Sequence, residues 1–223
     1  MVEEFILGID DAGRGPVIGP MVLAGCLLTE ESQRTLKRMG VKDSKELTPK
    51  RREMLADKVK EIAETFEVVI ATPEEIDNNF NGGSNLNKLE AQKMAEVINK
   101  INKGYNRIKV IIDCPSTTIS KWTDYLKTHV ENLSNLEIVC EHKADKNHVS
   151  VSAASIIAKH VREKEMDKLK EIYGSQIGSG YCSDQTTMMF LEKHALKHEH
   201  DGIFRKTWET WKTVCAKLAQ RTL

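Results

Sequence analysis

Residues 8–20 read GIDDAGRGPVIGP, and this stretch separates two apolar runs at residues 5–9 and 21–28. Apolar and β-branched runs on either side of a glycine- and proline-rich segment are typical of two strands joined by an elaborate turn, so we predict a hairpin. Asp10 and Asp11 stand side by side at the end of the first run, where their like charges repel. The function of the protein has to explain why two adjacent acids stand at this position.

The rest of the chain alternates between helical and strand patterns, which predicts an α/β fold. We expect a mixed five-stranded sheet flanked by helices, with an antiparallel hairpin first, parallel helix-connected strands after it, and a helical C-terminal extension. Three further strands are predicted, at residues 66–71, 107–113 and 136–141. Helices are predicted after the N-cap Thr48, over residues 86–101, around residues 122–130, over residues 152–173 and in the C-terminal part.

The composition is that of a globular protein: 223 residues, 40% of them hydrophobic and 30% charged. No apolar run approaches the ~18 residues of a membrane span. The N-terminus has neither the basic start nor the apolar core of a secretory signal, so we expect a cytoplasmic protein, or a nuclear one if the source is eukaryotic. The five cysteines are spread out and contain no CxxC pair, which is typical of reduced, buried thiols.

The formal net charge is zero, but the charges are unevenly distributed. Residues 34–60 hold ten Lys and Arg against four acids, and residues 143–223 hold fourteen against ten. Such segments are ordinarily solvated helix faces. They form a phosphate-binding surface only if something nearby acts on phosphates.

Acidic residues follow three of the predicted strands or the loops after them: Asp10 and Asp11, Asp113, and Asp145. An isolated Asp at a strand end is usually a turn former. Several converging carboxylates, however, require a cation, and oxygen ligands without Cys or His favour Mg²⁺ or Mn²⁺. Two such ions ~4 Å apart suit in-line phosphoryl displacement. Because neighbouring strand residues point to opposite faces, we expect the glycines that follow Asp11 to bend the chain so that both acids reach one pocket.

Two other sites are disfavoured. His194, His198 and His200 invite a zinc site, but no Cys or acid at ligand spacing completes it, so a solvated helix end is the alternative. The glycines at 13, 15 and 19 have neither the dinucleotide-binding spacing nor the lysine and serine of a P-loop. We therefore expect them to allow close approach to a polynucleotide strand.

The chain resembles the type 2 ribonucleases H, specifically ribonuclease HII in its single-chain archaeal form, from residue 8 to residue 213. Five motifs carry the resemblance in order: GIDDAGRGPVIGPMV (8–22), GVKDSKELTPKRRE (40–53), VIIDCPS (110–116), EHKAD with VSAASIIAK (141–159) and GSGYCSD (178–184).

The resemblance implies a ribonuclease H-like catalytic domain over residues 1–173 and a helical, substrate-binding part over residues 174–223 packed on the same domain. It also implies hydrolysis of RNA in RNA/DNA hybrids and incision 5′ of single ribonucleotides in duplex DNA, leaving 3′-OH and 5′-phosphate ends. These activities belong to DNA replication and ribonucleotide excision repair. A monomer is expected.

By matched position, the resemblance implies that Asp10, Asp11, Asp113 and Asp145 are the catalytic residues and the ligands of Mg²⁺ or Mn²⁺, with two ions in the substrate complex. No general-base histidine is needed in this scheme.

Substrate-binding roles are implied in the same way. The backbone of Gly13, Arg14 and Gly15 contacts the ribose 2′-OH, the group that distinguishes RNA from DNA. Tyr181 packs on the sugar at the RNA-to-DNA junction, and its alternative role is an aromatic cap over a glycine-rich loop. Lys45 holds a phosphate.

Three positions depart from the family pattern. Asp11 stands where the family has Glu, which allows an alternative function, a hybrid-binding protein with weakened catalysis. His148 and Val149 replace a Tyr-Pro pair, and Gln185 replaces a proline.

The C-terminus contains Gln220-x-x-Leu223, which resembles the front half of a sliding-clamp-binding peptide but lacks its aromatic pair. The alternative for this segment is a plain helix terminus.

Overall fold

The structure of the protein is a computed structural model that describes residues 4–41 and 47–221. In that part of the chain, no helix is both long and apolar enough to cross a membrane. The chain divides into two compact units. The first comprises Met1–Ala12, Val22–Ile70 and Asn87–Val161, and the second comprises Gly13–Met21, Ala71–Leu86 and Arg162–Leu223.

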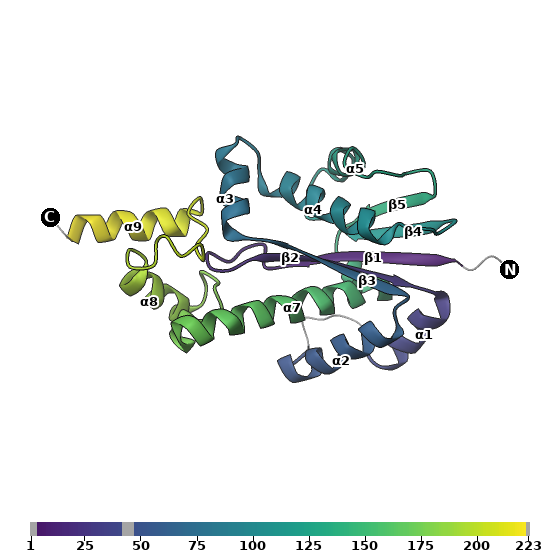
Figure 1. Ribbon diagram of the computed structural model, residues 1–223, viewed down its shortest axis with the longest axis horizontal. Coiled ribbons are helices and arrows are strands. Elements are labelled where there is room, and N and C mark those ends of the chain that lie inside the picture. Colours follow the sequence, from purple (N-terminus) through teal and green to yellow (C-terminus); the bar gives the residue numbers. More distant parts are fainter. Residues whose placement is uncertain (1–3, 42–46, 222–223) are drawn as a thin grey trace. The chain divides into compact units, whose positions relative to one another are not determined.

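The first unit contains the five strands of the sheet: β1 (Phe5–Ala12), β2 (Met21–Leu28), β3 (Thr65–Ala71), β4 (Ile108–Asp113) and β5 (Leu136–Glu141). They lie in the order β3-β2-β1-β4-β5 (Figure 1). β1 pairs antiparallel with β2 and parallel with β4, and β4 pairs parallel with β5. The prediction of a mixed five-stranded sheet in an α/β fold is therefore confirmed.

Helices cover both faces of this sheet (Figure 1): α1 (Glu30–Arg38), α2 (Pro49–Ile62), α4 (Leu86–Ile101), α5 (Ile119–Lys127), α6 (Ala144–Asn147) and the first part of α7 (Val149–Tyr173). One face packs on α1, α2 and α7 through Cys26 and Leu28 of β2, Leu55 of α2 and Ile157 of α7. On the other face, a Cβ at Gly25 of β2 would lie 2.5 Å from Val97 of α4. Burial on both faces explains why the strands are nearly continuous apolar runs.

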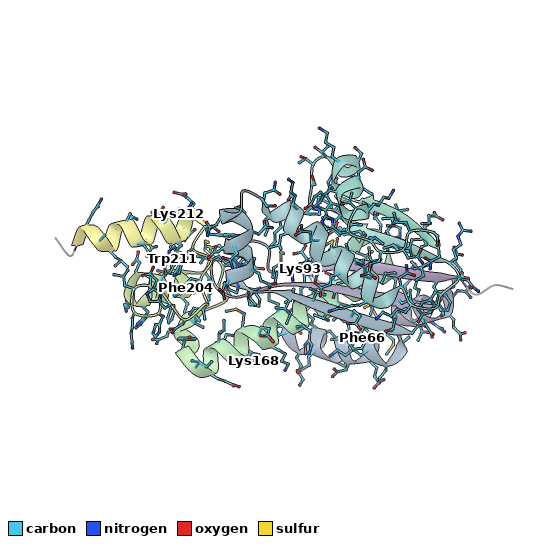
Figure 2. The ribbon with its side chains drawn as sticks, turned by 45° about the horizontal axis from the view of Figure 1, so that its top comes forward. Phe66, Lys93, Lys168, Phe204, Trp211 and Lys212 are labelled. Carbon is cyan, nitrogen blue, oxygen red and sulfur yellow. The ribbon has the colours of Figure 1, made fainter. Side chains whose placement is uncertain are left out.

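The second unit contains α3 (Pro73–Asn81), the end of α7, a 3-10 turn η2 (Ser175–Ile177), α8 (Gln185–His194) and α9 (Glu209–Arg221). Its apolar core includes Phe204 and Trp211, whose ring centroids lie 4.5 Å apart (Figure 2). An isolated antiparallel bridge joins Ile18 to Phe204. The glycine-rich segment after β1 therefore belongs to the C-terminal core of this unit.

Among the described residues, the helices α1, α3 and the four-residue α6 have no counterpart in the sequence prediction. α1 buries only Leu36, so it has almost no apolar periodicity, although its Thr29 N-cap does mark its start. α3 begins with a capping box of Thr72 and Glu75. β1 also runs three residues beyond the predicted end, to Ala12. Weak periodicity rather than weak capping explains why α1 and α3 were not predicted, and α6 is too short to show a period.

Candidate active site

Asp10 and Asp113 lie at the carboxyl ends of neighbouring parallel strands. The register sets Ile9 of β1 beside Ile112 of β4, so the two acids are the next residues of the two strands. Parallel strands end at the same edge of a sheet, and ligands gather there in α/β proteins. The acids are thus brought together by the strand register, although 103 residues separate them in the sequence.

Asp145 comes from α6, the short helix that follows β5. Lys143 adopts a left-handed conformation with φ of 59° just before this helix, which reverses the chain toward the sheet. The amide of Ala144 donates a hydrogen bond to Oδ1 of Asp113 at 3.2 Å. One oxygen each of Asp10, Asp113 and Asp145 can be chosen so that all three lie within 4.8 Å of one another.

The carboxyl groups of this cluster interact unfavourably as anions. Burial raises the pKa of Asp10 well above its ordinary value, and the charges of Asp11 and Asp113 raise it further. Hydrogen bonds from the Ser155 hydroxyl and the Asp11 amide, the latter at 2.7 Å, act in the opposite direction. Burial also raises the pKa of Asp113, and the charge of Asp145 adds to this effect.

The donor set fits a divalent cation. Three carboxylates supply only hard oxygen ligands, which is the set that Mg²⁺ and Mn²⁺ prefer. A cation between them would remove the repulsion and favour the charged form of each acid. Among the described residues, Asp10, Asp113 and Asp145 are the cluster of His, Cys, Asp or Glu side chains that could hold a metal ion. His198 instead lies 2.9 Å from an oxygen of Asp201.

Asp11 differs from the other three acids. β1 pairs regularly with β2 as far as Ala12, with Asp11 beside Leu23 and Ala12 beside Val22, so the chain does not bend before Gly13. That Asp10 and Asp11 reach one pocket stays a prediction. Asp10 is buried, Asp11 is half-buried, and Asp11 is not in the cluster of three. Its charge nevertheless raises the pKa of Asp10 and of Asp113, so it adds to the field of the site. Its role as a ligand stays a prediction.

The start of α7 lies against β1 at Gly8. A Cβ at this position would lie 2.0 Å from the backbone carbon of Ser150, so only glycine allows this approach. The contact brings α7 close enough for Ser155 to hydrogen bond with Asp10. Neither Gly8 nor Ser155 could be predicted as a site residue from the sequence, because their roles depend on a contact between distant segments.

His148, one of the departures from the family pattern, fixes the turn after α6. Its Nε2 lies 2.9 Å from Oε1 of Glu141, and Asn147 donates to the same oxygen at 3.2 Å. Glu141 is the register partner of Asp113 at the end of β5. Glu141 is an acidic residue at the end of its strand, as Asp113 is, and this feature could have identified it from the sequence as a candidate site residue.

Residues 13–15 and Tyr181 lie together in the second unit. A Cβ at Gly15 would lie 4.0 Å from the ring of Tyr181. The guanidinium of Arg162 lies 4.8 Å from the centroid of the same ring and donates to the carbonyl of Ser179 at 3.1 Å. Tyr181 is 38% exposed. A ring that is accessible in this way can stack on part of a nucleotide.

Asp184 holds the loop that carries Tyr181. Its carboxylate accepts hydrogen bonds from the amide and hydroxyl of Ser179 at 2.7 and 2.8 Å, and from the amide of Thr186 at 2.9 Å. These bonds, those from Ser179 foremost, lower the pKa of Asp184 to about 2. The loop is therefore fixed at the N-terminus of α8, although Gln185 stands there in place of a proline.

Two predicted features lie outside the described residues. Lys45 belongs to residues 42–46, and Leu223 belongs to residues 222–223. The phosphate-binding role of Lys45 and the clamp-binding peptide stay predictions.

Comparisons with known proteins agree with this geometry. The profile of the family described as Ribonuclease HII matches residues 7–211. The chain is 41% identical to Ribonuclease HII of Methanococcus maripaludis strain C6 over 220 residues, which cover 97% of this chain and 90% of that protein. It is also 41% identical to Ribonuclease HII of Thermococcus onnurineus over 219 residues, which cover 96% and 92%.

Solved structures give the same result. The ribonuclease H2 of Pyrococcus horikoshii OT3 matches with a TM-score of 0.87 and 36% identity, over 97% of this chain and 99% of that one. RNase HII in a PCNA:RNase HII complex from Archaeoglobus fulgidus matches with a TM-score of 0.80 and 35% identity, over 92% and 95%. Bst-RNase HIII in complex with Mn²⁺, at 23% identity and a TM-score of 0.79 over 98% and 71%, shares the fold. The chain therefore belongs to the ribonuclease HII family, ribonuclease H enzymes that cut the RNA of RNA/DNA hybrids endonucleolytically.

Proposed function

We propose that this chain cleaves the RNA strand of RNA/DNA hybrids and also incises 5′ of single ribonucleotides in duplex DNA, leaving 3′-OH and 5′-phosphate ends. The observation that carries the proposal is the cluster of Asp10, Asp113 and Asp145, with oxygens within 4.8 Å of one another at the carboxyl edge of the sheet. Such a cluster is suited to phosphodiester hydrolysis assisted by divalent ions.

Asp10, Asp113 and Asp145 would hold Mg²⁺ or Mn²⁺, with two ions in the substrate complex, and Asp11 would contribute a fourth carboxylate. Bound there, the ions would supply the positive charge that activates an attacking water and stabilises the departing ribose 3′-oxygen. The protein residues keep the acids in place: the Asp11 amide and Ser155 hold Asp10, and the Ala144 amide holds Asp113. Bst-RNase HIII, which shares the fold, was solved in complex with Mn²⁺.

Substrate selection would come from residues of the second unit and from Lys45. The backbone of residues 13–15 would contact the ribose 2′-OH, and Tyr181 would pack on the sugar at the junction. The half-exposed ring of Tyr181 beside Gly15 supports this assignment. Residues 174–223 would form the substrate-binding part, and Lys45 would bind a phosphate.

A sliding clamp is the proposed protein partner of an otherwise monomeric enzyme. The RNase HII of Archaeoglobus fulgidus was solved as a complex with PCNA. In this chain the peptide would begin at Gln220, at the end of α9. A clamp pull-down with the intact C-terminus and with residues 220–223 deleted tests this partner, and equal retention of both forms would contradict it.

The activity is tested with three duplexes of one sequence: an RNA/DNA hybrid, a DNA duplex with one ribonucleotide, and an all-DNA duplex. In Mg²⁺ or Mn²⁺ the protein should cut the first two, leave 3′-OH ends and spare the third. Asp10→Asn should abolish cutting and still bind the hybrid, whereas Asp124→Asn, at an exposed position on α5, should cut normally. Hybrid binding without cutting by the unaltered protein would favour the weakened, hybrid-binding alternative that Asp11 suggests.

A further inference from the structure

The carbonyl groups of the glycine-rich segment are bound by one arginine from the C-terminal part of the second unit. Arg205 is fully buried, which is rare for a charged side chain. Its Nη2 donates to the carbonyl of Gly13 at 2.6 Å and its Nη1 to that of Arg14 at 2.9 Å. Its Nε and Nη2 also donate to the carbonyl of Gly19, at 3.0 and 2.9 Å. One guanidinium therefore fixes both ends of the segment.

Trp208 completes this set of contacts. Its indole N–H donates to the carbonyl of Gly15 at 3.2 Å, and the guanidinium of Arg205 lies 5.1 Å from its ring centroid. The turn that carries both side chains is anchored by Asp77 of α3, which accepts from the amides of residues 206 and 207 at 2.7 and 2.9 Å. Arg205 and Trp208 thus bind the carbonyls of three successive residues, 13, 14 and 15.

Because peptide groups are planar, these contacts also determine the direction in which the amide N–H groups of the segment point. The structure contains no cis peptide bond among the residues it describes, and in a trans peptide group the C=O and the N–H point in opposite directions. The Gly13 carbonyl shares its peptide group with the Arg14 amide, and the Arg14 carbonyl shares its group with the Gly15 amide. Since Arg205 binds both carbonyls, both N–H groups point away from its guanidinium.

We propose that Arg205 is the positioning residue that orients the amides of Arg14 and Gly15 as donors to the ribose 2′-oxygen. This inference rests on the proposed function, in which the backbone of residues 13–15 contacts the 2′-OH. Arg205 acts only through the backbone it holds and touches no reacting atom. Trp208 assists it by fixing the carbonyl of Gly15.

The chemistry of the side chain explains why arginine is required. Its planar fork offers five N–H donors in fixed directions, which suits carbonyls that approach from several sides. Lysine keeps the charge but offers a single nitrogen, so it cannot hold Gly13, Arg14 and Gly19 in the same geometry. Arg205→Lys is therefore expected to keep the positive charge and to release the segment.

The test measures ribonucleotide preference in binding. Dissociation constants are determined by fluorescence anisotropy in EDTA for a DNA duplex with one ribonucleotide and for the all-DNA duplex of the same sequence. The preference for the ribonucleotide is the dissociation constant of the all-DNA duplex divided by that of the ribonucleotide duplex. Arg205→Lys should reduce this ratio roughly tenfold, which corresponds to about one misplaced hydrogen bond, and leave the all-DNA constant unchanged. Trp208→Phe should reduce the ratio less. Trp211→Phe loosens the core of the same unit and should keep the ratio.

The outcomes separate this inference from the proposed function. If the unaltered protein prefers the ribonucleotide duplex and Arg205→Lys keeps that preference, the inference is wrong and the function stands. If Arg205→Lys does not fold, Trp208→Phe decides, and an undiminished ratio in that variant overturns the inference. An unaltered protein that cuts at the ribonucleotide but binds both duplexes equally overturns the inference and the 2′-OH contact on which it rests, and leaves the cleavage activity standing. Failure to cut any ribonucleotide-containing duplex overturns both.

Discussion

Asp10 is a carboxylic acid that its surroundings push toward the protonated form. It is buried, it adjoins Asp11 in the chain, and its pKa is raised by burial and by neighbouring charges. Burial of an acid among acids is unfavourable for folding unless a cation or a proton compensates. The unfavourable placement is therefore consistent with a residue kept for ion binding rather than for stability.

Asp11 can be changed to the residue that the family pattern has. Asp11→Glu adds one methylene, which lets a half-buried carboxylate reach further toward the cluster. We expect Mg²⁺-supported cleavage to rise roughly tenfold, because misplacement by about 1 Å can cost up to ~100-fold in rate. Initial rates on the single-ribonucleotide duplex measure the effect, and Asp11→Asn serves as the control that removes the charge. A lower rate for Asp11→Glu would mean that the pocket has adapted to the shorter acid.

At the scale of elements, the contact between β1 and α7 sets the geometry of the acids. A Cβ at Gly8 would meet the backbone of Ser150 at 2.0 Å, a distance that no rotamer change can relieve. Gly8→Ala should therefore destabilise the protein by about 3 kcal/mol and displace Ser155 from Asp10. Urea unfolding measures the loss. Gly104→Ala is the matched control: no atom lies near its Cβ, its φ is 80°, and it should cost only about 1 kcal/mol.

The N-terminus of α8 supplies a pH-dependent contribution. Asp184 has a pKa lowered to about 2 by its bonds from Ser179 and Thr186, so its stabilisation is present above the unfolded pKa of about 4 and is lost as pH falls toward 2. Asp184→Asn removes the charge that these bonds favour and, because the site is partly exposed and screened by solvent, should cost only about 1 kcal/mol at pH 7; the difference should shrink as pH is lowered toward 3. Urea unfolding at several pH values tests this. Asp167→Asn, which removes an exposed ion pair with Lys170, should change stability by less than about 0.5 kcal/mol.

The sequence predicted the elements that bury apolar surface better than those that do not. The strands and α4 followed from apolar patterning, whereas α1, with Leu36 as its single buried residue, offered too little periodicity. In the site, the predicted strand ends were enough to place Asp10 and Asp113 at one edge of the sheet. The contacts of Arg205 could not be predicted, because up to 192 residues separate it from the carbonyls it binds and nothing local encodes that pairing.

For the whole molecule, a net charge of zero has to be reconciled with a polyanionic substrate. Asp10, Asp113 and Asp145 lie together at the edge of the sheet, whereas the excess of Lys and Arg over acidic residues is concentrated in residues 34–60 and 143–223. Phosphate contacts release counterions, so binding by such basic segments weakens as salt rises.

Hybrid binding should therefore fall at least roughly tenfold between about 50 and 200 mM salt when measured in EDTA. Lys50→Gln, at the exposed start of α2, should reduce the slope of log affinity against log salt by about one if Lys50 contacts a phosphate. Lys103→Gln, an exposed lysine after α4, should leave the slope unchanged. A slope near zero for the unaltered protein would contradict the electrostatic account.

The most direct test of the central claim, that aspartates from two strands and a short helix form one ion site for RNA cleavage, measures ion binding and cleavage on the same samples. Mn²⁺ binding is followed by calorimetry and hybrid cleavage by initial rate, for the unaltered protein, Asp113→Asn and the exposed control Asp124→Asn. The account predicts that Asp113→Asn loses Mn²⁺ affinity and cleavage together, by roughly 100-fold or more in rate, while Asp124→Asn keeps both. Cleavage by Asp113→Asn at the unaltered rate would contradict it.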